Sequence, residues 1–150
     1  MVPILESERL RLRGHTLEDF APGCVMWTRL LRYVGHWQLL DYGFWVVTDK
    51  VSGAFLGEVG FADFKRDFTP ALGVPEIGWA LMPHAHGKGV ATEAVQAALI
   101  WGDQRWPRTA CLISPENTPS IRVADKCGYR PYAHITFAGT PTTLFERLTK

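Results

Sequence analysis

A glycine-rich stretch near the middle of the chain, residues 83–94, holds the residue types best suited to chemistry. An apolar segment, residues 76–82, precedes it and is typical of a buried strand, and a helical pattern of apolar residues follows over 89–105. A strand that turns directly into a helix presents free backbone N–H groups at the positive end of the helix dipole. Gly87 and Gly89 would let an anion approach those groups without a Cβ in the way. The stretch therefore predicts an anion-binding turn that suits a phosphate group.

Two common phosphate-binding motifs do not fit this turn. A P-loop needs Ser or Thr directly after Gly-Lys, but Gly89 follows Gly87-Lys88. The dinucleotide motif G-x-G-x-x-G needs a third glycine where Thr92 stands. A metal site is also disfavoured, because the neighbouring histidines His84 and His86 have no third ligand nearby in the sequence. We therefore expect no metal.

The elements around the turn predict an α/β protein. Strands are expected over residues 4–13, 43–48, 54–64, 76–82, 109–114, 129–137 and 142–148, and helices over 28–40, 89–105 and 117–127. A further helix could begin at Thr16, but Pro22 and Gly23 would disturb it. This order predicts a mixed sheet with helices on both faces, in which strands 76–82 and 109–114 are parallel neighbours joined by a crossover helix.

Composition limits the class of protein. The 150 residues suit one domain, and a hydrophobic fraction of 47% with 21% charged residues is typical of a soluble globular protein. A net charge of +1 gives no broad field for nucleic acid or membrane, and no apolar run is long enough to cross a bilayer. Cys24, Cys111 and Cys127 show neither a disulfide framework nor zinc spacing, so we expect a reduced, cytoplasmic protein.

Three segments resemble the GCN5-related N-acetyltransferase (GNAT) superfamily. Residues 86–91, His-Gly-Lys-Gly-Val-Ala, resemble its Arg/Gln-x-x-Gly-x-Gly/Ala turn, although His86 replaces the usual Arg or Gln. Residues 117–129 resemble its Asn-x-x-Ser…Lys-x-Gly-Phe segment, and residues 6–13 resemble the opening of the RimJ/RimL-type branch, which acetylates ribosomal-protein N-termini. The resemblance implies a mostly antiparallel sheet of about six or seven strands, with a parallel pair that splays apart at the coenzyme site.

The resemblance also implies acetyl-CoA as the co-substrate. The backbone of Trp79, Ala80 and Leu81 would bind the pantetheine arm together with Asn117. The turn amides would hold the pyrophosphate, with charge added by Lys88 and Lys126. The full set of expected coenzyme contacts is Trp79, Ala80, Leu81, His86, Gly87, Lys88, Gly89, Val90, Ala91, Asn117 and Lys126.

Acetyl transfer to an amine requires a group that removes a proton from the amine. Glu76, at the start of the central strand, is the first choice, and Glu58 on the preceding strand is the second; either carboxylate could instead be only exposed or salt-bridged. The family's usual tyrosine acid is replaced by Ala124, so the resemblance leaves Ser120 as the candidate acid, with Tyr129 as a weaker one. Departure of an unprotonated thiolate is an open alternative.

The resulting prediction is an N-acetyltransferase, residues 1–150, that acts by direct attack in a ternary complex. The acceptor would be a primary amine on a protein N-terminus, an amino acid or a small molecule. The alternative is a CoA- or acyl-CoA-binding protein without catalysis. A homodimer is compatible with the sequence. The helical segment near residues 22–40 is shorter than in the family, which suggests a deletion or missing residues near Trp27–Thr28.

Overall fold

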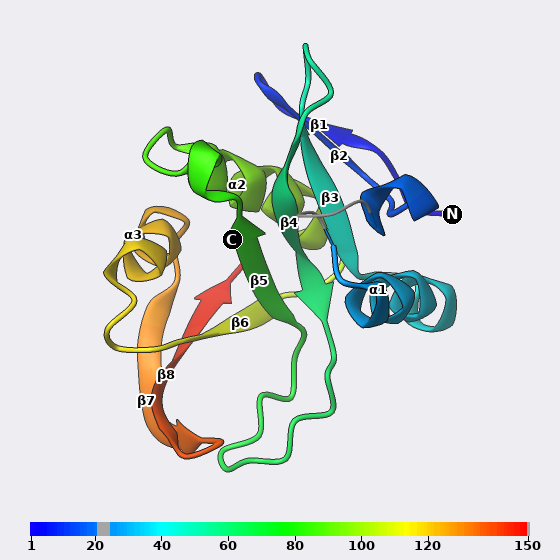
Figure 1. The fold of residues 1–150 in the computed structure, drawn as a ribbon. Coiled ribbons are helices and arrows are strands. Elements are labelled where there is room, and N and C mark those ends of the chain that lie inside the picture. Colours follow the sequence, from blue (N-terminus) through cyan, green and yellow to red (C-terminus); the bar gives the residue numbers. More distant parts are fainter. Residues whose placement is uncertain (21–24, 150) are drawn as a thin grey trace.

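The computed structural model describes residues 1–20 and 25–149, and its central feature is an eight-stranded sheet in the order β1-β2-β3-β4-β5-β6-β8-β7 (Figure 1). The strands are β1 (Leu5–Glu6), β2 (Leu10–Arg13), β3 (Phe44–Asp49), β4 (Phe55–Ala62), β5 (Glu76–Leu81), β6 (Arg108–Ile113), β7 (Arg130–Phe137) and β8 (Thr140–Leu148). The helices are α1 (Trp27–Leu40), α2 (Val90–Gly102) and α3 (Thr118–Lys126), with short 3-10 turns η1 (Leu17–Phe20) and η2 (Pro83–Ala85).

The first predicted strand is a small hairpin instead of one continuous strand. The backbone N–H of Ser7 donates to the carbonyl of Leu10 at 3.0 Å and closes the turn between β1 and β2. The Ser7 hydroxyl also donates to Glu93 of α2, which holds the turn against that helix. This division explains why the sheet has eight strands instead of the six or seven expected.

The splayed parallel pair is confirmed. All other neighbours in the sheet are antiparallel, whereas β5 and β6 run parallel and are in register at Glu76 and Ala110. Among the described residues, β5 and β6 are paired at this one position. Their carboxyl-terminal halves therefore separate, and the edge of β5 that faces β6 keeps free backbone groups.

Helices cover both faces of the sheet. On one face, α2 packs against the strand residues Val59, Phe61 and Ile77 within the main hydrophobic core. Helical spacing predicts a buried stripe of Ala91, Ala94, Val95, Ala98, Leu99 and Gly102, and all of these except the half-buried Ala91 are buried. On the other face, the Tyr33 ring of α1 stacks on Phe44 of β3 at a centroid distance of 4.5 Å. Residues on β4 and β5 therefore point alternately toward α2 and toward the α1 side.

The segment between β2 and β3 is helical in two unequal parts. The helix expected from Thr16 is reduced to the 3-10 turn η1, whereas α1 begins one residue before its predicted start. Trp27 and Thr28 both lie in the first turn of α1, so the place where the sequence suggests a deletion or missing residues falls at the start of this helix. Pro22, Gly23 and Cys24 lie outside the described residues. Within the ranges 1–20 and 25–149, no helix has the length and apolar character needed to span a bilayer.

Candidate active site

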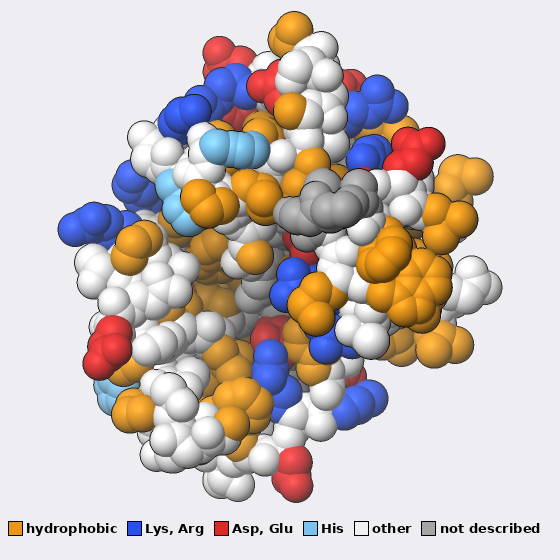
Figure 2. Space-filling model, viewed as in Figure 1, with side chains coloured by type: hydrophobic (Ala, Val, Ile, Leu, Met, Phe, Trp, Pro, Cys, Tyr) orange, Lys and Arg blue, Asp and Glu red, His pale blue; other side chains and the backbone are white. Residues whose placement is uncertain are grey.

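A cleft of about 700 Å³ lies where β5 leaves β6, between the start of α2 and the exposed side of α3. Figure 2 shows that this face of the molecule is hollowed near its centre. The cleft is lined by Trp79, Ala80, Leu81, Ala85, His86, Gly87, Gly89, Val90, Ala91, Thr92, Asn117, Pro119, Ser120, Arg122, Val123 and Lys126. All predicted coenzyme contacts except Lys88 are in this set.

The glycine turn has the geometry of an anion site. Gly87 and Gly89 adopt left-handed backbone angles, with φ of 73° and 75°, and Gly89 is the N-cap of α2. Residues with a Cβ rarely adopt these angles, which accounts for glycine at both positions. Among the described residues, no acceptor bonds the backbone N–H groups of residues 87–91. These groups are available to a phosphate at the positive end of the helix dipole.

His86 fixes the shape of the turn. Its Nε2 donates to the carbonyl of Leu81 at 2.8 Å, which links the end of β5 to the start of the turn. His86 also lines the cleft, so it combines a structural bond with a position in the cleft wall. Lys88 differs from the prediction, because it is exposed and is not among the cleft-lining residues.

Arg9 holds the turn from outside the cleft. Its Nη1 donates to the carbonyl of Lys88 at 3.0 Å, and its Nε donates to Glu93 at 2.7 Å. Burial by itself raises the pKa of the Glu93 carboxyl, but hydrogen bonds from Ser7 and from the Arg9 backbone and side chain hold it below its ordinary value. Sequence reasoning missed this contact because the partners are about eighty positions apart and no local pattern joins them.

Helix α3 supplies polar and basic groups to the cleft. Asn117 is its N-cap and accepts from the Ser120 backbone N–H at 3.2 Å, and both residues line the cleft. Arg122 was not predicted, although Lys126 lies four positions later on the same helical face. The spacing from Lys126 was the one local signal for Arg122, because residues four apart share a helix face. The lining residues include no carboxylate, which leaves the cleft cationic.

Neither the residue at the family's tyrosine position, Ala124, nor the weaker candidate acid, Tyr129, faces the cleft. Ala124 has no exposed surface, so the residue at the family's tyrosine position does not face the cleft. Tyr129 is buried, and its hydroxyl lies 2.6 Å from the Thr109 hydroxyl. Burial raises the pKa of Tyr129 well above its ordinary value. Ser120 therefore remains the hydroxyl beside the cleft that matches the predicted acid.

The two candidate bases occupy different environments. Glu76 lies at the joined end of β5 and β6, where Arg66 donates to both of its carboxylate oxygens at 2.5 and 3.2 Å. It lines a separate pocket of about 330 Å³. Glu58 is the register partner of Ala80, which lines the main cleft. Neither carboxylate lines the main cleft, but Glu58 is the cross-strand neighbour of a residue that does, whereas Glu76 lines the other pocket.

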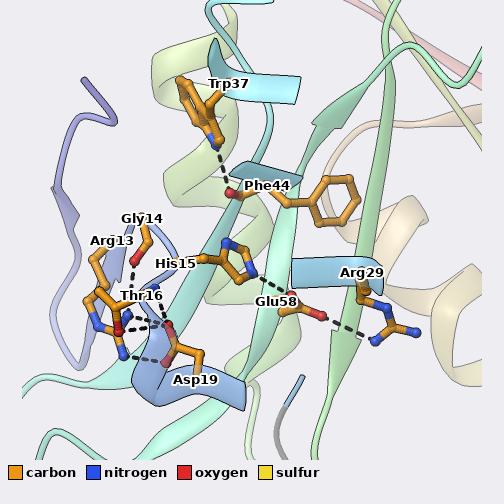
Figure 3. Close-up of polar contacts among 9 residues, drawn as sticks. All are labelled: Arg13, Gly14, His15, Thr16, Asp19, Arg29, Trp37, Phe44 and Glu58. Atoms are coloured by element: carbon orange, nitrogen blue, oxygen red, sulfur yellow. Dashed lines mark hydrogen bonds and ion pairs between the residues drawn. The ribbon is translucent and has the colours of Figure 1, made fainter. Parts of the chain in front are cut away.

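Glu58 is buried and contacted from two sides (Figure 3). His15 Nε2 lies 2.6 Å from its Oε2, and Arg29 of α1 donates to its Oε1 at 3.3 Å. The His15 side chain is 1% exposed and that of Arg29 is 40% exposed. The carboxylate thus has one enclosed partner and one that reaches the surface. A carboxylate held in this way, one strand position from a cationic cleft, can accept a proton from a group that enters along Ala80.

A mixed sheet that splays beside an anion-binding helix N-terminus defines an acetyltransferase fold of the GNAT type. The chain belongs to that family, since the acetyltransferase (GNAT) domain model matches residues 9–130. It is 33% identical over 105 residues to YkkB of Bacillus subtilis (strain 168), an uncharacterized protein, and the match covers 69% of this chain and 59% of that relative. The chain thus spans less than two thirds of that curated relative.

Solved structures agree with the fold. A GNAT-family acetyltransferase from Bordetella pertussis superposes with a TM-score of 0.85 at 33% identity, over 97% of this chain and 99% of that one. RimL, a ribosomal L7/L12 α-N-protein acetyltransferase solved with coenzyme A, superposes with a TM-score of 0.75 at 16% identity, over 97% and 98%. At that identity, the likeness to RimL is one of fold.

Proposed function

We propose that this chain is an acetyl-CoA-dependent N-acetyltransferase that acetylates a primary amine. The observation that carries the proposal is the position of Glu58 beside Ala80, at the edge of a cationic cleft built from the splayed strands. Family membership supports acetyl transfer in general. The cleft supports acetyl-CoA, and the adjacent carboxylate supports an acceptor that must lose a proton.

The cleft residues fit the parts of acetyl-CoA. The free N–H groups of residues 87–91 suit the pyrophosphate, and Arg122 and Lys126 add positive charge for phosphate oxygens. The unpaired edge of β5 at residues 79–81 offers backbone groups to the amide-containing pantetheine arm. Asn117 lies at the same end of the cleft as Ser120 and can bond that arm as well.

The proposed reaction needs a base and an exit for the thiolate. Glu58 takes a proton from the acceptor ammonium, and the neutral amine nitrogen then forms a bond to the acetyl carbon. The carbon–sulfur bond breaks as the nitrogen sheds its second proton, and the Ser120 hydroxyl can relay that proton to the departing CoA thiolate. Because Arg29 covers Glu58 Oε1 through a long contact, its half-exposed side chain must swing aside for the ammonium to replace it. Glu58 thus takes the role that the sequence had assigned first to Glu76.

The acceptor is proposed only as a primary amine. RimL acts on a protein N-terminus, and its shared fold makes a peptide amine one member of the class. Amino acids and small amines are the other members. The near-neutral net charge of the chain, +1, gives no general preference for a strongly charged acceptor.

Release of free CoA from acetyl-CoA tests the proposal directly. The purified chain is incubated with acetyl-CoA and a panel of peptides with free N-termini, amino acids and small amines, and the released thiol is measured with a thiol reagent. We expect amine-dependent release, with an equal amount of acetylated amine seen by mass spectrometry. Thermal stabilisation by acetyl-CoA without release on any amine would instead favour the non-catalytic binding protein.

A further inference from the structure

His15 makes the closest contact with the proposed base. Its Nε2 lies 2.6 Å from Glu58 Oε2, and the two side chains are 1% and 5% exposed. This hydrogen bond to a carboxylate is short and enclosed, and it is strong because water does not compete for either group. Nothing in the local sequence pattern around His15 links it to a residue 43 positions away.

The loop that carries His15 is closed by an ion pair (Figure 3). Arg13 donates to both carboxylate oxygens of Asp19, at 2.9 and 2.8 Å, and also to the carbonyl of Gly14 at 2.9 Å. Asp19 in turn accepts from the Thr16 backbone N–H at 2.7 Å. The backbone on both sides of His15 is therefore held, and the ring has little freedom to leave Glu58.

The protonation of the ring follows from its partners. His15 Nδ1 is buried and has no hydrogen-bond partner among the described residues. A carboxylate oxygen accepts, so the ring nitrogen that faces Glu58, Nε2, carries a proton and donates it to Oε2. On its other side the ring contacts Tyr33, at a centroid distance of 5.3 Å, which limits its tilt.

We infer that His15 is a positioning residue for Glu58 in the proposed acetyl transfer. By holding Oε2, it fixes the rotation of the carboxylate. Oε1, the atom now covered by Arg29, is then the oxygen that meets the acceptor ammonium. The inference rests on the proposed function, because it assigns His15 a role only if Glu58 removes that proton.

A double-mutant cycle tests this coupling. The variants are His15→Leu, His15→Gln, Glu58→Gln and the double variant H15L/E58Q, and kcat and KM are measured well below each variant's Tm. We expect H15L to lower kcat by about tenfold to a hundredfold, the usual effect of losing a charge-assisted hydrogen bond, with KM for acetyl-CoA unchanged. H15Q, whose amide nitrogen can reach the same oxygen, should recover most of kcat. In the E58Q background, H15L should cause no further loss.

The matched control is His134→Leu on β7, a histidine bonded to Thr143 away from the cleft. Three results would each overturn the inference. H15L could keep the wild-type kcat, H15L could lower kcat as much in the E58Q background as in the wild type, or H15Q could have a kcat no higher than that of H15L. If H15L does not fold, the comparison of H15Q with His15→Asn replaces it, because the shorter amide does not reach Glu58.

A second measurement does not depend on turnover. Nitrogen NMR of the imidazole should show a protonated Nε2, with the Nε2 signal moving in E58Q. Turnover by the wild type combined with an unprotonated Nε2 would overturn the inference alone. Absence of amine-dependent turnover in the wild type would reject the proposed function and the role of His15 with it, whatever the tautomer.

Discussion

The Arg9 guanidinium donates to the carbonyl of Lys88 at 3.0 Å and so joins the N-terminal hairpin to the glycine turn. Glu93 accepts from the same guanidinium and from Ser7, which ties the first turn of α2 to the hairpin. His86 holds the other end of the turn through the Leu81 carbonyl. The turn is therefore fixed at both ends, and its free amides face the cleft.

Replacing Arg9 should weaken acetyl-CoA binding without changing the chemical step. Arg9→Met removes the bonds to Lys88 and Glu93, and we expect the Kd for acetyl-CoA to rise about threefold to tenfold, the lower part of the range for charged hydrogen bonds because Arg9 is half-exposed. Calorimetric titration gives Kd, and kcat at saturating acetyl-CoA should stay unchanged. Arg11→Met on the same hairpin is the control. Equal affinity in R9M and wild type would contradict this role.

Arg122 and Lys126 should contribute electrostatically to coenzyme affinity. Each alanine variant should raise the Kd for CoA by about threefold to tenfold, because a charged bond to a phosphate is lost. The difference from wild type should shrink at high salt, since exposed charges are screened. Lys88→Ala, whose side chain lies outside the cleft, serves as the control. A larger effect of K88A than of R122A and K126A would show that the phosphates lie on the other side of the turn.

Replacing Glu58 and replacing Glu76 should cause different defects. Glu58→Gln should lower kcat about 10²- to 10⁴-fold, the usual contribution of a general base. Glu76→Gln should mainly lower Tm, because it breaks the paired contact with Arg66. Steady-state kinetics and thermal unfolding of both variants provide the comparison. A strong loss of kcat in E76Q with an unchanged Tm would return the role of base to Glu76.

Stability should depend on pH through Asp19. Burial by itself raises the pKa of this carboxyl, but bonds from Arg13 and the Thr16 backbone hold it below its ordinary value of 3.8. Because the folded-state pKa is the lower one, the stabilisation is complete above the ordinary value and is lost as pH falls through the folded-state pKa. Asp19→Asn should lower Tm at neutral pH, with a difference from wild type that narrows in acid. Asp125→Asn, which breaks an exposed ion pair with Arg130, should show almost none of this dependence.

The thiols of Cys111 and Cys127 should not react with thiol reagents in the folded protein. Both are buried, and burial raises the pKa of Cys127 to about 11 and that of Cys111 further. The thiolate is the reactive form, so little is available near neutral pH. A Cys24→Ser variant should therefore show two reactive thiols only after denaturation. Reaction of either thiol in the native variant would show that the core opens more readily than its packing indicates.

Local sequence patterns determined most of the fold of this protein and its coenzyme turn. Alternation of apolar residues marked the strands, and a 3.6-residue period marked the buried stripe of α2. Gly87 and Gly89 predicted a turn whose backbone an anion can approach, and Asn117 predicted an N-cap, because few other residues suit those positions. These features depend on neighbours within a few positions, which a sequence displays directly.

The tertiary structure decided which carboxylate lies beside the cleft and which side chains surround it. Glu58 and Glu76 look alike in the sequence, but Glu58 pairs in register with Ala80, a residue of the cleft wall, and Arg66 is bonded to Glu76. The contacts of His15 and Arg9 join segments 43 and about eighty positions apart. Strand pairing and helix packing create such contacts, and no periodicity encodes them. The sequence therefore determined the anion-binding turn to which the coenzyme phosphates are proposed to bind, and only the folded chain could bring the proposed base, its partner histidine and the turn-holding arginine into place.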